Sequence, residues 1–162
     1  MQTTIGIIGN GFVGNAVAKG FKDKVSEIKV YDINKDKSTH SYLETMISDY
    51  IFICLPTPMI DAEGGKCNLS IIENFFRLAS DVVTDGIFII KSTVPIGTTD
   101  NFIEKYPDLK IVHNPEFLTA ANANSDFINA DRTVIGGKTD WIKPLIELYE
   151  NFYSHIPIHT MK

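Results

Sequence analysis

Three glycines and one acidic residue near the start of the chain have the types and spacing that bind a dinucleotide. Gly9, Gly11 and Gly14 follow directly after a short apolar run, and Asp32 ends the next strand-like run. In such an arrangement one glycine permits a tight turn, another lets the backbone approach a pyrophosphate, and the third lets a helix pack closely on a strand. The helix that begins there directs its unpaired N–H groups and its positive dipole end at the phosphates. The sequence therefore predicts a dinucleotide-binding turn.

Asp32 indicates which dinucleotide this turn would bind. A carboxylate at the tip of the second strand accepts hydrogen bonds from the hydroxyls of the adenosine ribose, and it repels the 2′-phosphate of NADP. We therefore expect NAD as the cofactor, although Lys35 and Lys37 supply some positive charge nearby. The alternative interpretation is an ordinary turn between a strand and a helix, in which Asp32 is a turn-forming residue followed by Asn34.

Three further segments combine a proline with hydroxyl, amide or carboxylate groups. They are residues 54–58, 91–99 and 113–118, and each begins at the end of an apolar run. Proline stiffens a turn and so holds the neighbouring polar groups in place. If the runs are parallel strands, the segments meet at the carboxyl edge of one sheet, where open α/β sheets bind their ligands. We expect them to complete the site that the glycines begin.

Short apolar runs alternate with amphipathic stretches along the whole chain. This rhythm predicts βαβ crossovers and hence an α/β fold of Rossmann type, a doubly wound, mainly parallel sheet with helices on both faces. Ser70 and Glu73 have the spacing of a capping box at the start of one helix. Residues 59–68 form the longest irregular stretch. The predicted strands are 4–9, 27–31, 50–55, 86–91, 110–113 and 133–136, with a weak one at 156–159, and the predicted helices lie near 12–21, 41–47, 70–83, 98–106 and 140–153.

Length and composition limit the other functions that the chain could have. Its 162 residues are typical of one domain, and 44% hydrophobic residues suffice for a full core. The net charge of −5 offers no footprint for nucleic acid, and no apolar run approaches the ~20 residues that span a bilayer. The histidines lack metal-ligand spacing, so no metal is expected. The two cysteines are too few for a disulfide framework, and the N-terminus runs straight into the glycine motif, so no secretory signal is expected. Both observations favour a reducing, cytoplasmic setting.

Five segments together resemble the NAD-binding domain of the UDP-glucose and GDP-mannose dehydrogenase family. They are residues 9–14, 54–58, 91–99, 114–118 and 131–137, in the family's order. The resemblance spans essentially the whole chain, and segments 91–99 and 114–118 are far more specific than the glycine turn. It implies an NAD-dependent oxidoreductase that converts the primary alcohol of a sugar nucleotide to a carboxylate in two steps. In this family a cysteine carries the substrate as a covalent thioester.

The resemblance also implies roles for individual residues. Thr93 would position a water molecule near the reacting carbon, and Glu116 would act as acid or base when the thioester forms or is hydrolysed. A carboxylate in a partly apolar cleft can have its pKa raised toward the working range, which suits this role. Asp32 and Lys37 would adjoin the adenosine ribose. The residues implied to bind NAD are Gly9, Asn10, Gly11, Phe12, Val13, Gly14, Asp32, Lys37, Leu55, Pro56, Thr57, Pro58, Ser92 and Thr93.

The chain departs from the family in ways that bear on activity. The central dimerisation helix and the C-terminal substrate domain, with its cysteine nucleophile, are absent from residues 1–162, which we expect to form a single NAD-binding domain. Such a chain would be a monomer or a weak dimer, and it would bind a sugar nucleotide only together with the missing half. Cys67 has no neighbouring histidine and is interpreted as a loop residue rather than a nucleophile. Ala120 and Ala121 stand where the family carries a second glutamate and a glycine.

Several residues have plainer interpretations that the sequence leaves open. Ser92 and Thr93 could cap the following helix, and Glu116 could pair with Arg132 as a structural ion pair. His113 is expected to be a satisfied residue at the end of a strand. For the whole chain, the alternatives are a stand-alone nucleotide-binding or partner-supplying module without catalysis, and another NAD-dependent hydroxy-acid dehydrogenase.

Overall fold

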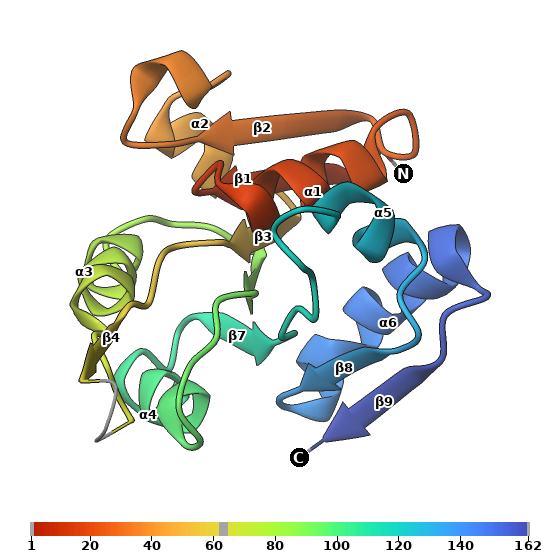
Figure 1. Ribbon diagram of the computed structural model, residues 1–162. Coiled ribbons are helices and arrows are strands. Elements are labelled where there is room, and N and C mark those ends of the chain that lie inside the picture. Colours follow the sequence, from red (N-terminus) through yellow and green to blue (C-terminus); the bar gives the residue numbers. More distant parts are fainter. Residues whose placement is uncertain (1, 62–64, 162) are drawn as a thin grey trace.

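A seven-stranded sheet runs through the molecule, and helices cover both of its faces (Figure 1). The computed structural model describes residues 2–61 and 65–161. The strands of the sheet are β1 (Thr4–Ile8), β2 (Glu27–Tyr31), β3 (Tyr50–Ile53), β6 (Ile87–Ile90), β7 (Lys110–His113), β8 (Thr133–Gly136) and β9 (Ile158–Met161). They lie in the order β2-β1-β3-β6-β7-β8-β9, and all neighbours are parallel except β7 and β8. The predicted α/β, doubly wound and mainly parallel fold is confirmed.

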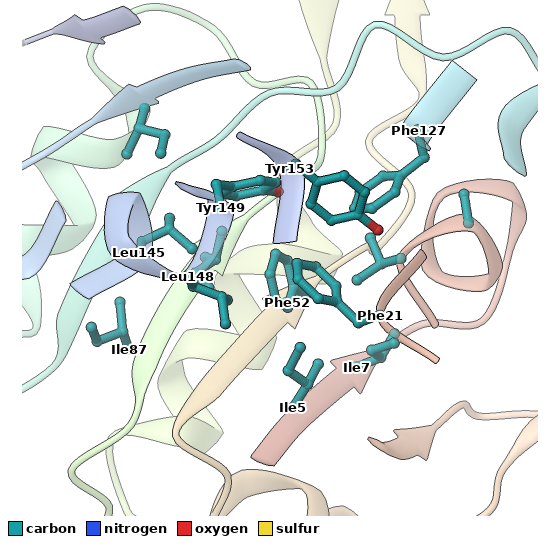
Figure 2. Close-up of a cluster of buried hydrophobic side chains, with 14 of the residues drawn as sticks. Ile5, Ile7, Phe21, Phe52, Ile87, Phe127, Leu145, Leu148, Tyr149 and Tyr153 are labelled. Carbon is teal, nitrogen blue, oxygen red and sulfur yellow. The ribbon is translucent and has the colours of Figure 1, made fainter. Parts of the chain in front are cut away.

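The helices divide between the two faces of the sheet and form two cores. They are α1 (Phe12–Phe21), α2 (Tyr42–Met46), α3 (Ser70–Ala79), α4 (Thr98–Lys105), α5 (Ala123–Ile128) and α6 (Thr139–Tyr153). Successive strand residues point to opposite faces, so Ile7 packs with α1, α5 and α6, whereas Ile8 packs with α2, α3 and α4. Figure 2 shows the first core, where the Phe21 ring contacts the rings of Phe52, Phe127, Tyr149 and Tyr153 at centroid distances of 5.6–6.0 Å.

The capping box lies at a different helix from the one predicted. Ser70 is already the first residue of α3, so the cap position falls on Leu69, whose side chain accepts no hydrogen bond. Ser41 and Glu44 form a capping box at the start of α2 instead, each side chain bonded to the other residue's backbone N–H. The box anchors a helix of only five residues, which has little propensity to form alone.

A pair of short strands and one helix were not anticipated from the sequence. The stretch 59–68, expected to be irregular, contains an antiparallel pair of strands, β4 (Met59–Asp61) and β5 (Lys66–Cys67). Residues 62–64 lie outside the described residues. The short helix α5 packs against α1 and contributes Ala123 and Phe127 to the first core.

The strand order reverses direction between β1 and β3, and this point defines where a ligand can enter. From β1 the chain crosses to β2 on one side, and from β3 it proceeds to β6 on the other. The carboxyl ends of β1 and β3 stay close, because the backbone N–H of Cys54 donates to the Ile8 carbonyl at 2.8 Å. Doubly wound sheets bind their ligands in the crevice above such a switch point.

Candidate functional site

Two of the three glycines in the turn are required by the fold itself. Gly9 has φ = +93°, and a Cβ there would lie 2.6 Å from the Cys54 carbonyl oxygen. A Cβ on Gly14 would lie 1.9 Å from the Gly9 carbonyl oxygen, so α1 could not pack this closely on β1 with any larger residue. A Cβ on Gly11, by contrast, would meet nothing within 4 Å. The opening beside Gly11 is where a ligand can approach the backbone.

The N-terminus of α1 opens toward the same space. Gly11 holds the cap position, and no side-chain hydrogen bond from the described residues caps the helix. The first N–H groups of a helix lack intrahelical partners and carry its positive dipole end. This geometry, with the opening beside Gly11, fits the pyrophosphate of a dinucleotide.

Asp32 ties the glycine turn to the end of β2. One carboxylate oxygen accepts a hydrogen bond from the Asn10 N–H at 2.7 Å, and the other accepts one from the Asn34 N–H at 2.8 Å. The Asn34 bond is the turn-forming contact of the plainer interpretation, so Asp32 does shape the local turn. Each oxygen keeps further lone-pair capacity. The half-exposed carboxylate is therefore available to a ligand as well.

A single large cleft, of about 1320 Å³, gathers most of the predicted site residues. It exceeds the roughly 300–1,000 Å³ of pockets for drug-sized ligands, as an extended dinucleotide requires. Asn10, Gly14 and Pro58 do not line it; the Asn10 side chain donates an N–H to the Lys37 carbonyl at 2.8 Å. The predicted residues that line the cleft are Gly9, Gly11, Phe12, Val13, Asp32, Lys37, Leu55, Pro56, Thr57, Ser92, Thr93 and Glu116.

The loops after β3 and β6 are joined by two side-chain hydrogen bonds. The Ser92 hydroxyl donates to the Leu55 carbonyl at 2.6 Å, and the Thr57 hydroxyl donates to the Thr93 carbonyl at 2.6 Å. Ser92 is buried, whereas Thr93 is exposed to the cleft. Neither caps a helix, because α4 begins at Thr98 with Gly97 as its cap. The capping interpretation of this pair is therefore wrong.

Glu116 lies half-buried where the cleft meets a second pocket of about 400 Å³, and it lines both. Its Oε2 accepts a hydrogen bond from the backbone N–H of Leu118 at 2.5 Å. Within residues 2–61 and 65–161 no ion pair joins Glu116 to Arg132. The Arg132 guanidinium lies 4.8 Å from the centroid of the Phe117 ring instead. The structure therefore does not support the structural ion pair.

A buried lysine in the same region was missed by the sequence analysis. Lys91 directly follows β6, is 4% exposed and lines both pockets. Its Nζ donates to the Asn114 Oδ1 at 3.2 Å, and the Tyr149 hydroxyl donates to the same oxygen at 2.7 Å. Burial lowers the pKa of Lys91 to about 8 and raises that of Tyr149. The available signal was a lysine at the end of an apolar strand, within segment 91–99.

His113 is less well satisfied than expected. Its Nε2 is buried and has no hydrogen-bond partner among the described residues. Burial lowers the pKa of the imidazole, which a backbone hydrogen bond with Ser92 partly opposes. His113 is therefore held in its neutral form beside the loop that carries Thr93.

Neither cysteine has the environment of an activated thiol. Burial raises the pKa of Cys54 to about 12, and Cys67 donates its thiol hydrogen to the Thr57 carbonyl at 3.1 Å. Both cysteines are free. In the described part of the chain there is no group of three or more His, Cys, Asp or Glu side chains that could hold a metal ion. None of its helices combines the length and apolar character needed to cross a bilayer.

A family profile and curated relatives agree on one family. The profile of the UDP-glucose/GDP-mannose dehydrogenase family, NAD binding domain, matches residues 38–156. The chain is 34% identical over 121 residues to the UDP-glucose 6-dehydrogenase YwqF of Bacillus subtilis, covering 69% of this chain and 27% of that protein. It is 26% identical over 180 residues to the UDP-N-acetyl-D-mannosamine dehydrogenase of Methanocaldococcus jannaschii, covering 91% and 42%.

A solved structure supports the same architecture. The UDP-glucose dehydrogenase of Pyrobaculum islandicum superposes with a TM-score of 0.84 at 24% identity, and the match covers 100% of this chain and 46% of that one. At this level of identity the likeness establishes the fold. The chain spans less than half the length of each of these three proteins.

Proposed function

Because this chain belongs to the UDP-glucose/GDP-mannose dehydrogenase family through its NAD-binding domain, we propose that it provides the cofactor-binding half of a nucleotide-sugar dehydrogenase. The complete enzyme would oxidise the primary alcohol of a sugar nucleotide to the carboxylate with two molecules of NAD. The relatives named above are dehydrogenases of UDP-glucose and of UDP-N-acetyl-D-mannosamine. Which sugar nucleotide serves this chain depends on groups outside residues 1–162.

The cleft is the observation that carries this proposal. At one end lie the opening beside Gly11 and the carboxylate of Asp32, which suit the pyrophosphate and the adenosine ribose. At the other end lie Thr93 and Glu116, from the two segments most specific to the family. A dinucleotide in this cleft would extend from Asp32 toward Glu116, with its nicotinamide half beside the loops after β3 and β6.

In the proposed reaction the chain's own residues orient the cofactor and handle protons. When bound, NAD would supply the acceptor for the hydride that leaves the substrate carbon. The exposed Thr93 can hold a water molecule at that end of the cleft, and the half-buried Glu116 carboxylate can accept or donate a proton there. The hydrogen bonds from Ser92 and Thr57 fix the two loops relative to each other, so Thr93 is held in place.

The 162 residues alone would bind the cofactor without completing the reaction. Thioester chemistry needs an accessible thiolate. The thiol of Cys54 is buried with its pKa raised to about 12, and the Cys67 thiol is bonded to a backbone carbonyl. The proposed setting is the cytoplasm, where both thiols stay reduced.

The test has a binding step and an activity step. Calorimetry of the purified chain is expected to give one NAD site and weaker binding of NADP. With UDP-glucose or GDP-mannose and NAD, the chain alone is expected to form no NADH. Supplying the C-terminal half of a family member, fused or in trans, is expected to restore NADH formation that Glu116→Gln diminishes. Absence of NAD binding, or steady turnover by the chain alone, would overturn the proposal.

A further inference from the structure

Lys91 places a buried amine at the boundary between the cleft and the second pocket. The side chain is 4% exposed and lines both cavities at the end where Glu116 also lies. An ammonium group has three N–H donors. Among the described residues only one of them finds an acceptor, the Asn114 Oδ1 at 3.2 Å. The same oxygen accepts from Tyr149, so it is shared by two donors.

The surroundings compensate this charge only in part. In the described part of the chain no carboxylate lies within ion-pair distance of the Lys91 Nζ. The ring of Phe127 also faces the amine, and its centroid lies 6.0 Å from the Nζ. Glu116 and Cys54 also face the amine from the loops after β7 and β3. A cation in such a place acts strongly on any charged ligand group nearby, because little solvent screens it.

We propose that Lys91 determines which redox state of the cofactor the cleft prefers, by disfavouring the cationic nicotinamide ring of NAD⁺ relative to the neutral ring of NADH. This inference rests on the proposed function, in which the nicotinamide half occupies the end of the cleft near Glu116. Hydride transfer to NAD⁺ removes one positive charge from the ring. A fixed ammonium beside the ring therefore favours the reduced cofactor, which is the product of alcohol oxidation.

The preference should depend on pH in a way that identifies its source. The groups around the Lys91 amine are Cys54 on the β3 side, Glu116 after β7, His113 at the end of β7 and Tyr149 on α6. Because the pKa of Lys91 is lowered to about 8, its charge is lost over the mildly alkaline range. The pKa of Cys54 is raised to about 12 and that of Tyr149 is also raised, whereas the pKa of His113 is lowered. These three groups therefore keep the same charge across the mildly alkaline range in which Lys91 loses its proton.

The experiment measures the dissociation constants of NAD⁺ and NADH for the purified chain by calorimetry, at about pH 7 and about pH 9. In the unmodified chain the ratio Kd(NAD⁺)/Kd(NADH) is expected to fall by roughly fivefold or more between these values. Lys91→Met should show the lower ratio at both values, with no pH dependence. Lys91→Arg, which stays charged, should keep the high ratio at both. The ratio within one variant is insensitive to a small unfolded fraction.

Lys143→Met is the matched control, because Lys143 is exposed on α6 and lines neither pocket. It removes the same charge from the molecule and should leave the ratio unchanged. A ratio for Lys91→Met within about twofold of the unmodified chain would overturn the inference, as would an unmodified chain whose ratio is independent of pH. If neither nucleotide binds the unmodified chain, the proposed function itself fails, and that result is distinct from both.

Discussion

At the scale of single residues, Asp32 combines a structural and a ligand-binding role, and substitutions can separate the two. Asp32→Asn keeps one carbonyl oxygen for the backbone N–H of Asn10 or Asn34 but removes the charge. We expect a loss of NAD affinity on the order of 1.5–3 kcal/mol, and a narrower gap to NADP. Asp32→Ala should in addition lower the melting temperature of the free chain, because two N–H groups lose their acceptor. Calorimetry with both nucleotides and thermal unfolding give the two readouts. Equal affinity of the unmodified chain for NAD and NADP would contradict the assignment.

Glu116→Gln tests whether the carboxylate serves chemistry or stability. The only hydrogen bond of its side chain within the described residues comes from the Leu118 N–H, and the amide oxygen of glutamine can still accept it. We expect the free energy of unfolding to change by less than about 0.5 kcal/mol and the NAD affinity to stay the same. Thermal melts check the first expectation. If the free energy of unfolding falls by several kcal/mol, as expected when a buried ion pair is broken, Glu116 has a structural role.

Lys91 should make the stability of the fold rise with pH in a defined window. Its pKa is about 8 in the folded chain and 10.5 as the ordinary value, so between them the unfolded state binds more protons than the folded state. The free energy of unfolding therefore increases from about pH 8 upward. Cys54 acts in the opposite direction above its ordinary value of 9.0, because its folded pKa is about 12. The Lys91 contribution is isolated as the difference between the unmodified chain and Lys91→Met in urea titrations across this range. If this difference in the free energy of unfolding does not vary with pH, the pKa of Lys91 is not lowered by burial.

The residues predictable from sequence are those whose partners are set by local chain geometry. The glycine turn and Asp32 belong to one βαβ unit, in which strand, turn and helix fix their relative places. The network of Lys91, Asn114 and Tyr149 joins residues 23 and 35 positions apart and depends on how α6 packs against the sheet. No spacing rule connects these three positions, so the structure was needed to bring them together.

At the scale of elements, the start of α1 contains one glycine that the packing of the helix requires and one that ligand binding is expected to require. Substituting each in turn separates the two effects. Gly14→Ala would place a methyl group 1.9 Å from the Gly9 carbonyl oxygen, so α1 must shift away from β1. We expect the free chain to lose about 1–3 kcal/mol of stability or more.

The methyl group of Gly11→Ala would point into open space, so the free energy of unfolding should change by less than about 1 kcal/mol. Its NAD affinity should nevertheless fall, because the methyl group occupies the approach to the backbone. Thermal melts and calorimetry of this matched pair provide the check. If the NAD affinity of Gly11→Ala equals that of the unmodified chain, the glycine turn does not belong to the NAD-binding site.

Sequence patterns located the strands of the large sheet and five of the six α-helices well, but they missed the β4–β5 hairpin and α5. Helix α1 has the predicted bounds 12–21, since its apolar spacing and its glycine start agree. The hairpin of β4 and β5 is too short to show a period, and α5, with six residues, is too short to show an apolar face. Both exist because of what they pack on or pair with, which is tertiary information. The same reason explains the cap: Ser70 has the right spacing, but the chain enters α3 one residue earlier than a capping serine would need.

At the scale of the whole molecule, the two cores explain why the site lies at one edge of the sheet. Helices α1, α5 and α6 cover one face and α2, α3 and α4 the other, so neither face of the sheet is left for a ligand (Figure 1). The carboxyl ends of the strands are the remaining place where loops from both halves meet. The cleft there draws on segments near residues 9, 32, 55, 92 and 116, which lie far apart in the sequence.

The distribution of exposed apolar side chains leads to an expectation about self-association. Exposed apolar surface that is contiguous usually marks a place where something binds. In this molecule a group of these side chains lines the cofactor cleft, where NAD rather than a second copy would cover them: Phe12, Ile33, Leu43, Ile71 and Leu78. We therefore expect the 162-residue chain to sediment as a monomer at micromolar concentration, with and without NAD.

Any weak dimer formed through the cleft should dissociate when NAD saturates the site, because NAD and the second copy would contact the same side chains. A tight dimer that persists in saturating NAD would contradict this expectation and would place the association on another face, with the exposed Met59 and Ile60 of β4 as the first positions to substitute.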